Sequence, residues 1–259
     1  MTKLLVFVVE NHSFEQMRRQ MPWTFRLSET YGYATDYTAL RHPSLPNYLG
    51  IAGGSTFGVA DDHPPAEHPV QGASVFGQAL AMGRTARVYA EGMPGPCSVV
   101  DGGARYAVRH NPWAYFVDER DACRAHDMPL TGFAGDVADG HLPDAGLVIP
   151  DVCHDGHDCD LAVTDDWMRD HVGLAMSGPD WKAGRLAIVI TADEDDRVSG
   201  NRVLTTVAHP SLHGVVVDRP LNHYSLTRLY DEVLGAAPLR EAAGAPSMAH
   251  AFGLPVPAS

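Results

Sequence analysis

The sequence lacks the features that would place it in a membrane or on nucleic acid. No apolar run approaches the roughly 18 residues that a membrane-spanning helix needs. Basic side chains are scarce, since 19 Lys and Arg stand against 32 Asp and Glu, and the net charge of −13 disfavours polyanionic partners. Glu10 and Asn11 interrupt the first apolar run too early for a signal peptide. We therefore expect no membrane span and no nucleic-acid partner, and a cytoplasmic location as written, or secretion if a leader was trimmed.

Cysteine is also scarce, with four in the chain and no CxxC pair, which disfavours a zinc site built from cysteines. Cys153 and Cys159 are close enough in sequence to close a small disulfide loop, and Cys97 could pair with Cys123. Two disulfides would fit poorly with a reducing cytosol. The sequence alone therefore leaves the state of the cysteines open.

Internal repeats and low-complexity linkers are absent, so we expect a single domain over residues 1–259. Short apolar runs alternate with segments of helical pattern, which predicts an α/β fold with a largely parallel sheet and helices on both faces. The expected strands cover residues 3–9, 85–89, 147–149, 186–191 and 203–207, and residues 33–40 form a further strand or extended segment. The expected helices cover residues 14–19, 46–52, 74–82, 165–176 and 224–234.

Acidic and amide side chains follow two of these strands where each strand ends. Glu10 and Asn11 follow the first strand, and Asp193 and Glu194 begin an acidic run after residues 186–191. Ligands of open α/β sheets bind outside the carboxyl ends of the strands. Such oxygen donors suit Mg²⁺, Ca²⁺ or Mn²⁺, with Zn²⁺ as an option if an imidazole joins. An acidic run is more often a solvated turn, but the matching pair at the other strand end favours one shared metal site.

The segment His42-Pro43-Ser44-Leu45-Pro46-Asn47-Tyr48 places a serine just before an expected helix. Backbone N–H groups and the dipole at a helix N-terminus stabilise an anion. With a metal close by, Ser44 could attack a phosphorus atom as the alkoxide, and Asn47 could donate to the phosphoryl oxygens. The alternative is that Ser44 only caps the helix in a proline-rich turn.

Histidines gather in a third segment, Asp151-Val152-Cys153-His154-Asp155-Gly156-His157-Asp158, which follows an expected strand. His154 and His157 are candidates for a second metal, for phosphate hydrogen bonds or for protonation of a leaving group. His110 and His223 lie in two further polar segments. Each of these two could line a pocket, cap a helix or hold a loop.

Five motifs follow one another in a recognisable order: Glu10-Asn11-His12-Ser13-Phe14, the Ser44 segment, Cys153 to Cys159, Asp193-Glu194-Asp195-Asp196, and His223-Tyr224-Ser225-Leu226. Together they resemble the phosphoesterase family of bacterial acid phosphatases and phosphatidylcholine-type phospholipases C, within the alkaline-phosphatase superfamily. The likeness is greatest to the short, secreted actinobacterial acid phosphatases and spans roughly residues 4–235. It implies an alkaline-phosphatase-like, three-layer α/β/α fold with a mostly parallel central sheet.

The resemblance also implies roles for individual residues. Ser44 falls on the family's nucleophile, Asn47 on a phosphate ligand, and Asp195 competes with Glu194 for a place at the metal. The expected metal ligands are Glu10, Asn11, Ser44, Asp193 and Glu194, around one divalent Mg, Mn, Ca or Zn ion. The expected catalytic residues are Ser44, His157 and His154, and the expected substrate contacts are Asn47, His223 and Arg41.

We therefore expect a metal-dependent phosphatase that hydrolyses a small phosphomonoester through a phosphoserine at Ser44. The rival enzyme is a phosphodiesterase of phospholipase C type, for which no lipid-binding C-terminal domain is evident. A third hypothesis, a non-catalytic ion-binding protein of the same fold, would require loss of the nucleophile, yet Ser44 is present. The sequence does not indicate an oligomeric state.

Overall fold

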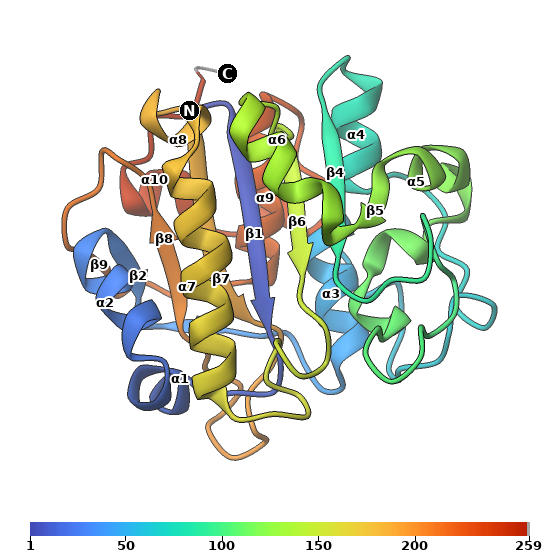
Figure 1. Cartoon of the computed structure of the whole chain (residues 1–259), viewed down its shortest axis with the longest axis horizontal. Helices are drawn as coiled ribbons and strands as arrows, with labels where there is room; N and C mark the ends of the chain where they lie inside the picture. Colours follow the sequence, from blue (N-terminus) through green and yellow to red (C-terminus); the bar gives the residue numbers. More distant parts are fainter. Residues whose placement is uncertain (258–259) are drawn as a thin grey trace.

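A computed structural model describes residues 1–257 and shows a central sheet of eight strands between layers of helices (Figure 1). The strand order is β5-β4-β6-β1-β7-β8-β2-β9, and β8 runs antiparallel to both of its neighbours. Two further short strands, β3 and β10, pair apart from this sheet. The strands are β1 (Lys3–Val9), β2 (Gly32–Ala34), β3 (Tyr37–Thr38), β4 (Ala86–Ala90), β5 (Asp127–Pro129), β6 (Ala145–Ile149), β7 (Leu186–Ala192), β8 (Thr205–Ala208), β9 (Val215–Val217) and β10 (Leu221–Asn222).

Helices cover both faces of the sheet, as the alternating pattern predicts. On one face α7 packs against α1, α2 and α6, and on the other α3 packs against α9, which contacts β1 (Figure 1). None of the helices in residues 1–257 is long and apolar enough to cross a membrane. The α-helices are α1 (Phe14–Gln20), α2 (Pro22–Thr30), α3 (Ser44–Gly53), α4 (Val75–Ala81), α5 (Arg120–His126), α6 (Phe133–Asp139), α7 (Leu161–Ser177), α8 (Pro179–Lys182), α9 (His223–Leu234) and α10 (Met248–Phe252).

The two central strands carry the features that position the site. Every residue of β7 is buried, as is β1 from Leu4 onward, because helices cover both faces. The strands run parallel and in register, so that Val9 lies opposite Ala192. The residues that follow them, Glu10 and Asp193, therefore emerge side by side at one edge of the sheet.

The predicted α/β fold with a mostly parallel sheet is confirmed, and several boundaries differ. The expected strand at 33–40 divides into β2 and β3, because the chain leaves one sheet and pairs with β10. The expected strand at 203–207 starts at Thr205, and the helix expected from residue 165 starts at Leu161. Helix α2 was not predicted.

Both cysteine pairs form disulfides. Cys97 is bonded to Cys123 and Cys153 to Cys159, with Cα–Cα distances of 5.3 and 4.7 Å that are ordinary for such bonds. The second disulfide closes the loop that holds Asp155. Because Glu10 N donates to Asp155 O at 2.8 Å, this loop is fastened to the end of β1.

Candidate active site

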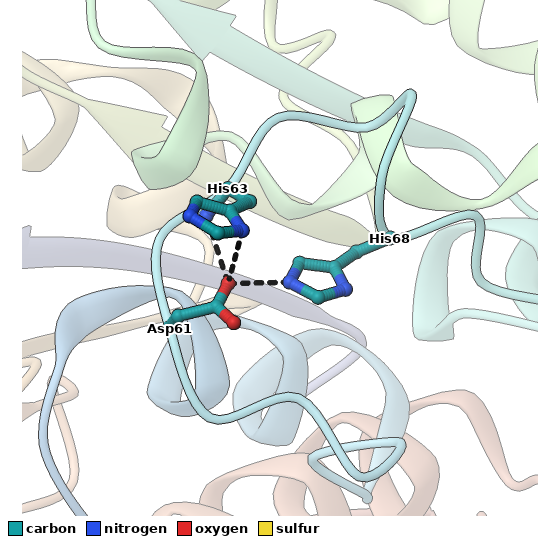
Figure 2. Close-up of side chains that lie close together, drawn as sticks. All are labelled: Asp61, His63 and His68. Atoms are coloured by element: carbon teal, nitrogen blue, oxygen red, sulfur yellow. Dashed lines mark hydrogen bonds and ion pairs between the residues drawn. The ribbon is translucent and has the colours of Figure 1, made fainter.

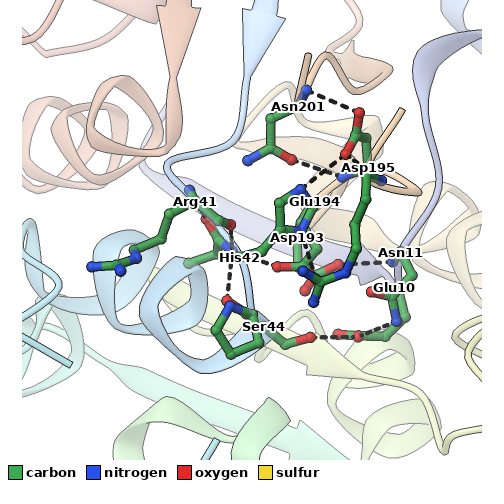
Figure 3. Close-up of polar contacts among 12 residues, drawn as sticks. Glu10, Asn11, Arg41, His42, Ser44, Asp193, Glu194, Asp195 and Asn201 are labelled. Carbon is green, nitrogen blue, oxygen red and sulfur yellow. Dashed lines mark hydrogen bonds and ion pairs between the residues drawn. The ribbon is translucent and has the colours of Figure 1, made fainter. Parts of the chain in front are cut away.

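The acidic residues at the ends of β1 and β7 meet as the sequence predicts (Figure 3). The backbone N–H of Asn11 donates to Asp193 Oδ1 at 2.9 Å, and its side-chain amide donates to Glu10 Oε2 at 3.3 Å. Asn11 has φ = 57°, in the left-handed region that asparagine tolerates better than most residues. This turn directs the chain out of the sheet and places the Asn11 backbone N–H against the Asp193 carboxylate.

Ser44 is the first residue of α3, and its hydroxyl reaches the same cluster. Ser44 Oγ donates to Glu10 Oε2 at 3.0 Å, and the Tyr48 hydroxyl donates to Glu10 Oε1 at 2.6 Å. Ser44 and Tyr48 are four residues apart, so that both project from one face of the helix. The Leu45 N–H donates to Asp62 Oδ1 at 2.9 Å, which places a carboxylate at the N-terminus of the helix. Two hydroxyls of one helix therefore hold Glu10 in place.

The cluster concentrates negative charge away from solvent. Glu10, Asp193 and Glu194 are at most 1% exposed. Burial, with the negative charge of neighbouring carboxylates, raises the pKa of Glu10 and of Asp193 well above the ordinary range, and burial raises the pKa of Glu194 to about 8. Within residues 1–257 these three carboxylates form no ion pair with Lys or Arg. Among the described residues only histidines come within ion-pair distance of them, His42 at Glu194 and His110 at Glu10.

This arrangement fits a divalent cation. Asp193 Oδ2 is buried and has no hydrogen-bond partner, so it offers a free ligand atom. Carboxylate, amide and hydroxyl oxygens are the donors that Mg²⁺, Ca²⁺ and Mn²⁺ prefer. A cation between Glu10, Asp193 and Ser44 would replace the missing positive charge. The candidate ligand set contains Glu10, Asn11, Ser44, Asp193 and Glu194.

His42 is a functional candidate that the sequence reasoning missed. Its Nδ1 lies 2.9 Å from Glu194 Oε1, and its Nε2 lies 3.1 Å from Asp195 Oδ1. Asp195 also accepts the backbone N–H groups of Arg197 and Ser199 in its own loop, and that of Asn201 (Figure 3). Asp195 is thus engaged with His42 and its loop. The sequence did contain a signal for His42, because this residue stands two positions before Ser44 in the segment from His42 to Tyr48.

Asn47 holds the loop before α3. Its Oδ1 accepts the N–H groups of Leu40 and Arg41, and its Nδ2 donates to the carbonyls of Arg41 and Pro43. The same Nδ2 lies 3.2 Å from Glu194 Oε2. Asn47 therefore fixes the direction in which Ser44 enters the helix. The Arg41 side chain points away from the carboxylates and is exposed (Figure 3).

Two histidines border the cluster. His110 is buried, with Nε2 3.4 Å from Glu10 Oε2 and Nδ1 3.1 Å from Asp155 Oδ2, and its ring stacks on Tyr48. Burial lowers the pKa of His110 well below the ordinary value, so its ring is neutral at pH 7. The ring of His157 is one-third exposed, and its Nδ1 lies 2.7 Å from Asp158 Oδ1. His157 stands at the solvent side of the cluster, and His110 lies beneath it.

Two other predicted site histidines do not contact the carboxylates of Glu10, Asp193 or Glu194. His154 Nδ1 lies 2.8 Å from Glu91 Oε2, and its ring stacks on Trp167. His223 is fully buried, with Nε2 2.6 Å from the carbonyl of Asp193 and Nδ1 3.1 Å from the Tyr37 hydroxyl. Burial lowers the pKa of His223 to about 4. His223 therefore stabilises the turn at Asp193 through its carbonyl and is not placed to contact a substrate.

A cavity of about 310 Å³ opens above Ser44. Arg109 and Arg197 supply positive charge at its wall, and Arg109 Nη2 lies 3.2 Å from His157 Nε2. A larger hollow of about 550 Å³ lies beside α9 and α10, but its lining includes no strand-end carboxylate pair. The smaller cavity is lined by Asn11, Pro43, Ser44, Asp62, Arg109, His157, Glu194 and Arg197.

Known proteins with sequences similar to this chain are named as phosphatases. Residues 13–235 match the model of the Phosphoesterase family. The phosphatidylinositol-3-phosphatase of Mycobacterium tuberculosis is 26% identical over 96% of this chain and 82% of that protein. The phosphate-repressible acid phosphatase of Penicillium chrysogenum is 29% identical over 74% of this chain, and that match spans 49% of the fungal protein. The chain thus spans about half the length of this fungal relative.

The fold has a counterpart among solved structures. A protein in the alkaline phosphatase superfamily from Vibrio parahaemolyticus superposes with a TM-score of 0.67 over 93% of this chain and 69% of that one. The two sequences are 10% identical, so the likeness concerns the fold alone. It confirms the fold that the motif order implies.

Proposed function

Because the chain belongs to the phosphoesterase family, we propose that it is a metal-dependent phosphatase that hydrolyses a small phosphomonoester through a phosphoserine at Ser44. The observation that carries the proposal is the position of the Ser44 hydroxyl. It lies at the start of α3, faces a cavity and donates to Glu10 in a buried cluster of carboxylates. The enzyme class that the motifs predict, a phosphoric monoester hydrolase, is confirmed by the family and by the acid phosphatases among the relatives.

The hydroxyl of Ser44 begins the reaction as the nucleophile. Its hydrogen bond to Glu10 orients the oxygen, and the Tyr48 hydroxyl holds that carboxylate still. Glu10, Asn11, Ser44, Asp193 and Glu194 would hold a divalent cation, which would supply the positive charge that favours the alkoxide form of the hydroxyl. The Ser44 Oγ–P bond forms, with the Oγ proton passing to Glu10 Oε2, as the bond from phosphorus to the leaving oxygen breaks. Water then cleaves the phosphoserine and releases inorganic phosphate.

Arg109 and Arg197 are the groups placed to bind the phosphoryl oxygens. Both line the cavity and carry positive charge at any pH of interest. Asn47 was the expected phosphate ligand, but its amide is occupied by the loop and by Glu194. We therefore assign Asn47 a positioning role and give the phosphate contact to the two arginines.

His157 is the proposed general acid. It lines the cavity, and a protonated imidazole can donate its proton to a leaving oxygen. Asp158 accepts from Nδ1, and Nε2 accepts from Arg109 Nη2 at 3.2 Å, so the acid role requires Arg109 to turn to the phosphate and a proton to occupy Nε2. His154 is not assigned to the reaction, because its ring contacts Glu91 and Trp167 and does not line the cavity.

A lipid phosphomonoester is a second candidate substrate, which the name of the mycobacterial relative suggests. A phospholipase C-type phosphodiesterase is the rival reaction, and it needs room for a second esterified group beyond the phosphate. The cavity volume of about 310 Å³ favours a compact monoester headgroup. A substrate panel should therefore include sugar phosphates, nucleotides and phosphatidylinositol 3-phosphate.

The test is hydrolysis of p-nitrophenyl phosphate against bis-p-nitrophenyl phosphate, before and after treatment with a strong chelator. The proposal expects turnover of the monoester, loss with the chelator and recovery with Mg²⁺, Mn²⁺, Ca²⁺ or Zn²⁺. Faster turnover of the diester would establish the rival reaction. Absence of turnover with every one of these metals and substrates would favour an ion-binding protein.

A further inference from the structure

A second group of metal-ligating atoms lies outside the active-site cavity, in a loop between α3 and α4 (Figure 2). His68 Nε2 lies 2.5 Å from Asp61 Oδ1, and His63 Nδ1 lies 3.4 Å from the same oxygen. The three ligand atoms are within 4.8 Å of one another. We propose that Asp61, His63 and His68 form a second metal site, which binds Zn²⁺ and is separate from the carboxylate cluster beneath Ser44.

The loop sequence brings these side chains together over a short distance. In the segment Asp61-Asp62-His63-Pro64-Pro65-Ala66-Glu67-His68, the His63 N–H donates to Asp61 Oδ1 at 3.0 Å. The His68 N–H donates to the carbonyl of Pro64 at 3.2 Å and closes a turn after the two prolines. The imidazole rings then stack, with centroids 5.9 Å apart and planes at 14°. Both rings present a nitrogen to one carboxylate oxygen (Figure 2).

The donor set matches zinc in type and number. Zinc binds imidazole nitrogen and carboxylate oxygen at about 2.0–2.2 Å, with four tetrahedral ligands. Tetrahedral ligands at that distance are about 3.4 Å apart, which the separation of His63 Nδ1 from Asp61 Oδ1 matches. His68 Nε2 makes a hydrogen-bond contact of 2.5 Å with the same oxygen and would move back by about 1 Å to share an ion. Glu67 Oε2 lies 3.1 Å from His63 Nδ1 and provides a fourth donor. The two carboxylates balance the charge of a divalent ion.

The loop is held in place and reaches the catalytic cavity. The Tyr115 hydroxyl donates to the carbonyl of His63 at 3.1 Å. Asp62, which lies between the ligands Asp61 and His63, accepts the Leu45 N–H at the start of α3 and lines the cavity. The ligand side chains themselves are accessible, with exposures of 44% for Asp61, 60% for His63 and 21% for His68. Zinc can therefore enter from solvent and fasten the loop that carries Asp62.

The test is a count of bound zinc ions on the intact protein, which does not depend on activity. We compare wild type, His63→Ala/His68→Ala and a matched control, His213→Ala, which removes an exposed histidine before β9. After equilibrium dialysis against zinc, the double variant should hold one ion fewer than the other two proteins. Asp193→Asn should keep the loop ion. Equal zinc content in wild type and the double variant would overturn the proposal, because the loop histidines would then form only ion pairs.

Thermal unfolding gives a second readout. Zinc at about 100 times its dissociation constant should raise the ratio of folded to unfolded protein about 100-fold through this site. Each protein is measured in the Asp193→Asn background, so that the carboxylate cluster binds no zinc. In this background the parent and His213→Ala should show the zinc-dependent rise in stability, and the histidine double variant should not. If the double variant does not fold, His63→Gln alone should weaken zinc binding at least tenfold while circular dichroism stays unchanged. Unaltered zinc affinity in folded His63→Gln contradicts the site.

Discussion

The carboxylate cluster beneath Ser44 and the Asp61 loop cluster both gather metal-ligating atoms, but the chain builds them in opposite ways. The first joins residues from the ends of β1 and β7, some 180 positions apart, and is buried. The second comes from eight consecutive residues and is exposed. Burial raises the pKa of Glu10 and Asp193, whereas a hydrogen bond from His68 lowers the pKa of Asp61.

This difference explains why the two clusters respond differently to loss of a cation. Buried carboxylates repel one another in a medium of low dielectric constant, so the folded chain itself favours a cation there. At the surface, water screens the charges, and the histidines already compensate Asp61. The buried cluster should therefore control both activity and stability, and the loop cluster should add stability only when zinc is bound.

The largest expected effect is that of Ser44→Ala. Removal of a nucleophile lowers turnover by several orders of magnitude, about 10⁴-fold or more, while binding and folding persist. Steady-state kinetics with p-nitrophenyl phosphate and a circular dichroism spectrum test this expectation. A loss within a factor of about three would refute the covalent mechanism.

The variant Asp193→Asn, compared with Asp195→Asn, tests which of the two aspartates binds the metal and which one only holds its loop. Asp193 carries a free buried oxygen, so its loss should remove cation-dependent activity, by about 10³-fold in kcat/KM. Asp195→Asn is the matched control, because Asp195 binds His42 and backbone N–H groups, and it should cost about 10- to 100-fold. Metal content and kcat/KM are measured for both. Greater loss in Asp195→Asn would reassign the ligand.

The variant His157→Ala tests whether His157 protonates the leaving group. A general acid matters most for poor leaving groups, so alkyl phosphates should slow about 100-fold and p-nitrophenyl phosphate far less. The comparison uses kcat on both substrates at pH 6. Equal losses on both would instead indicate that His157 binds phosphate or metal.

Asp127→Asn tests the burial of a single carboxylate outside the cluster, and its effect falls on stability and leaves turnover unchanged. Burial raises the pKa of Asp127 to about 8, above the value of about 3.9 in an unfolded chain. Its contribution to stability is therefore complete below pH 4 and is lost as the pH rises towards 8, by at most about 1.4 kcal/mol per pH unit. Urea unfolding between pH 5 and 8 should show a flatter pH dependence for the variant, because the titrating carboxyl is gone. Asn111 keeps an acceptor at this position, so the contact itself is preserved. Parallel curves for both proteins would contradict the shift.

The sequence was sufficient to predict the parts of the site that strand ends dictate. Continuous apolar runs identified β1 and β7, and their parallel register brings Glu10 beside Asp193 without further information. Ser44 was recognisable from its place before a helix. Both inferences rest on short-range patterns that the tertiary structure leaves intact.

Other contacts could not be read from the sequence, because they depend on how distant loops pack. His42 and His110 reach the carboxylates through a loop and a 3₁₀ turn whose paths no periodicity describes. His223 and Arg41 were the expected substrate contacts. His223 is instead buried against the carbonyl of Asp193, and the Arg41 side chain is exposed to solvent. Helix α2 begins at Pro22 directly after α1, and its residues Trp23, Thr24, Phe25 and Ser28 have lower helix propensities than Ala, Leu or Glu.

The most direct test of the central claim is mass spectrometry of the enzyme after acid quench during turnover of a phosphomonoester. The account predicts one added phosphoryl group on the peptide that contains Ser44 in the wild type, and none in Ser44→Ala. Because His157 is proposed to act on the leaving group, a His157→Ala sample should still show the modified peptide. An unmodified Ser44 peptide during rapid turnover, or a phosphoryl group on another residue, would contradict the account.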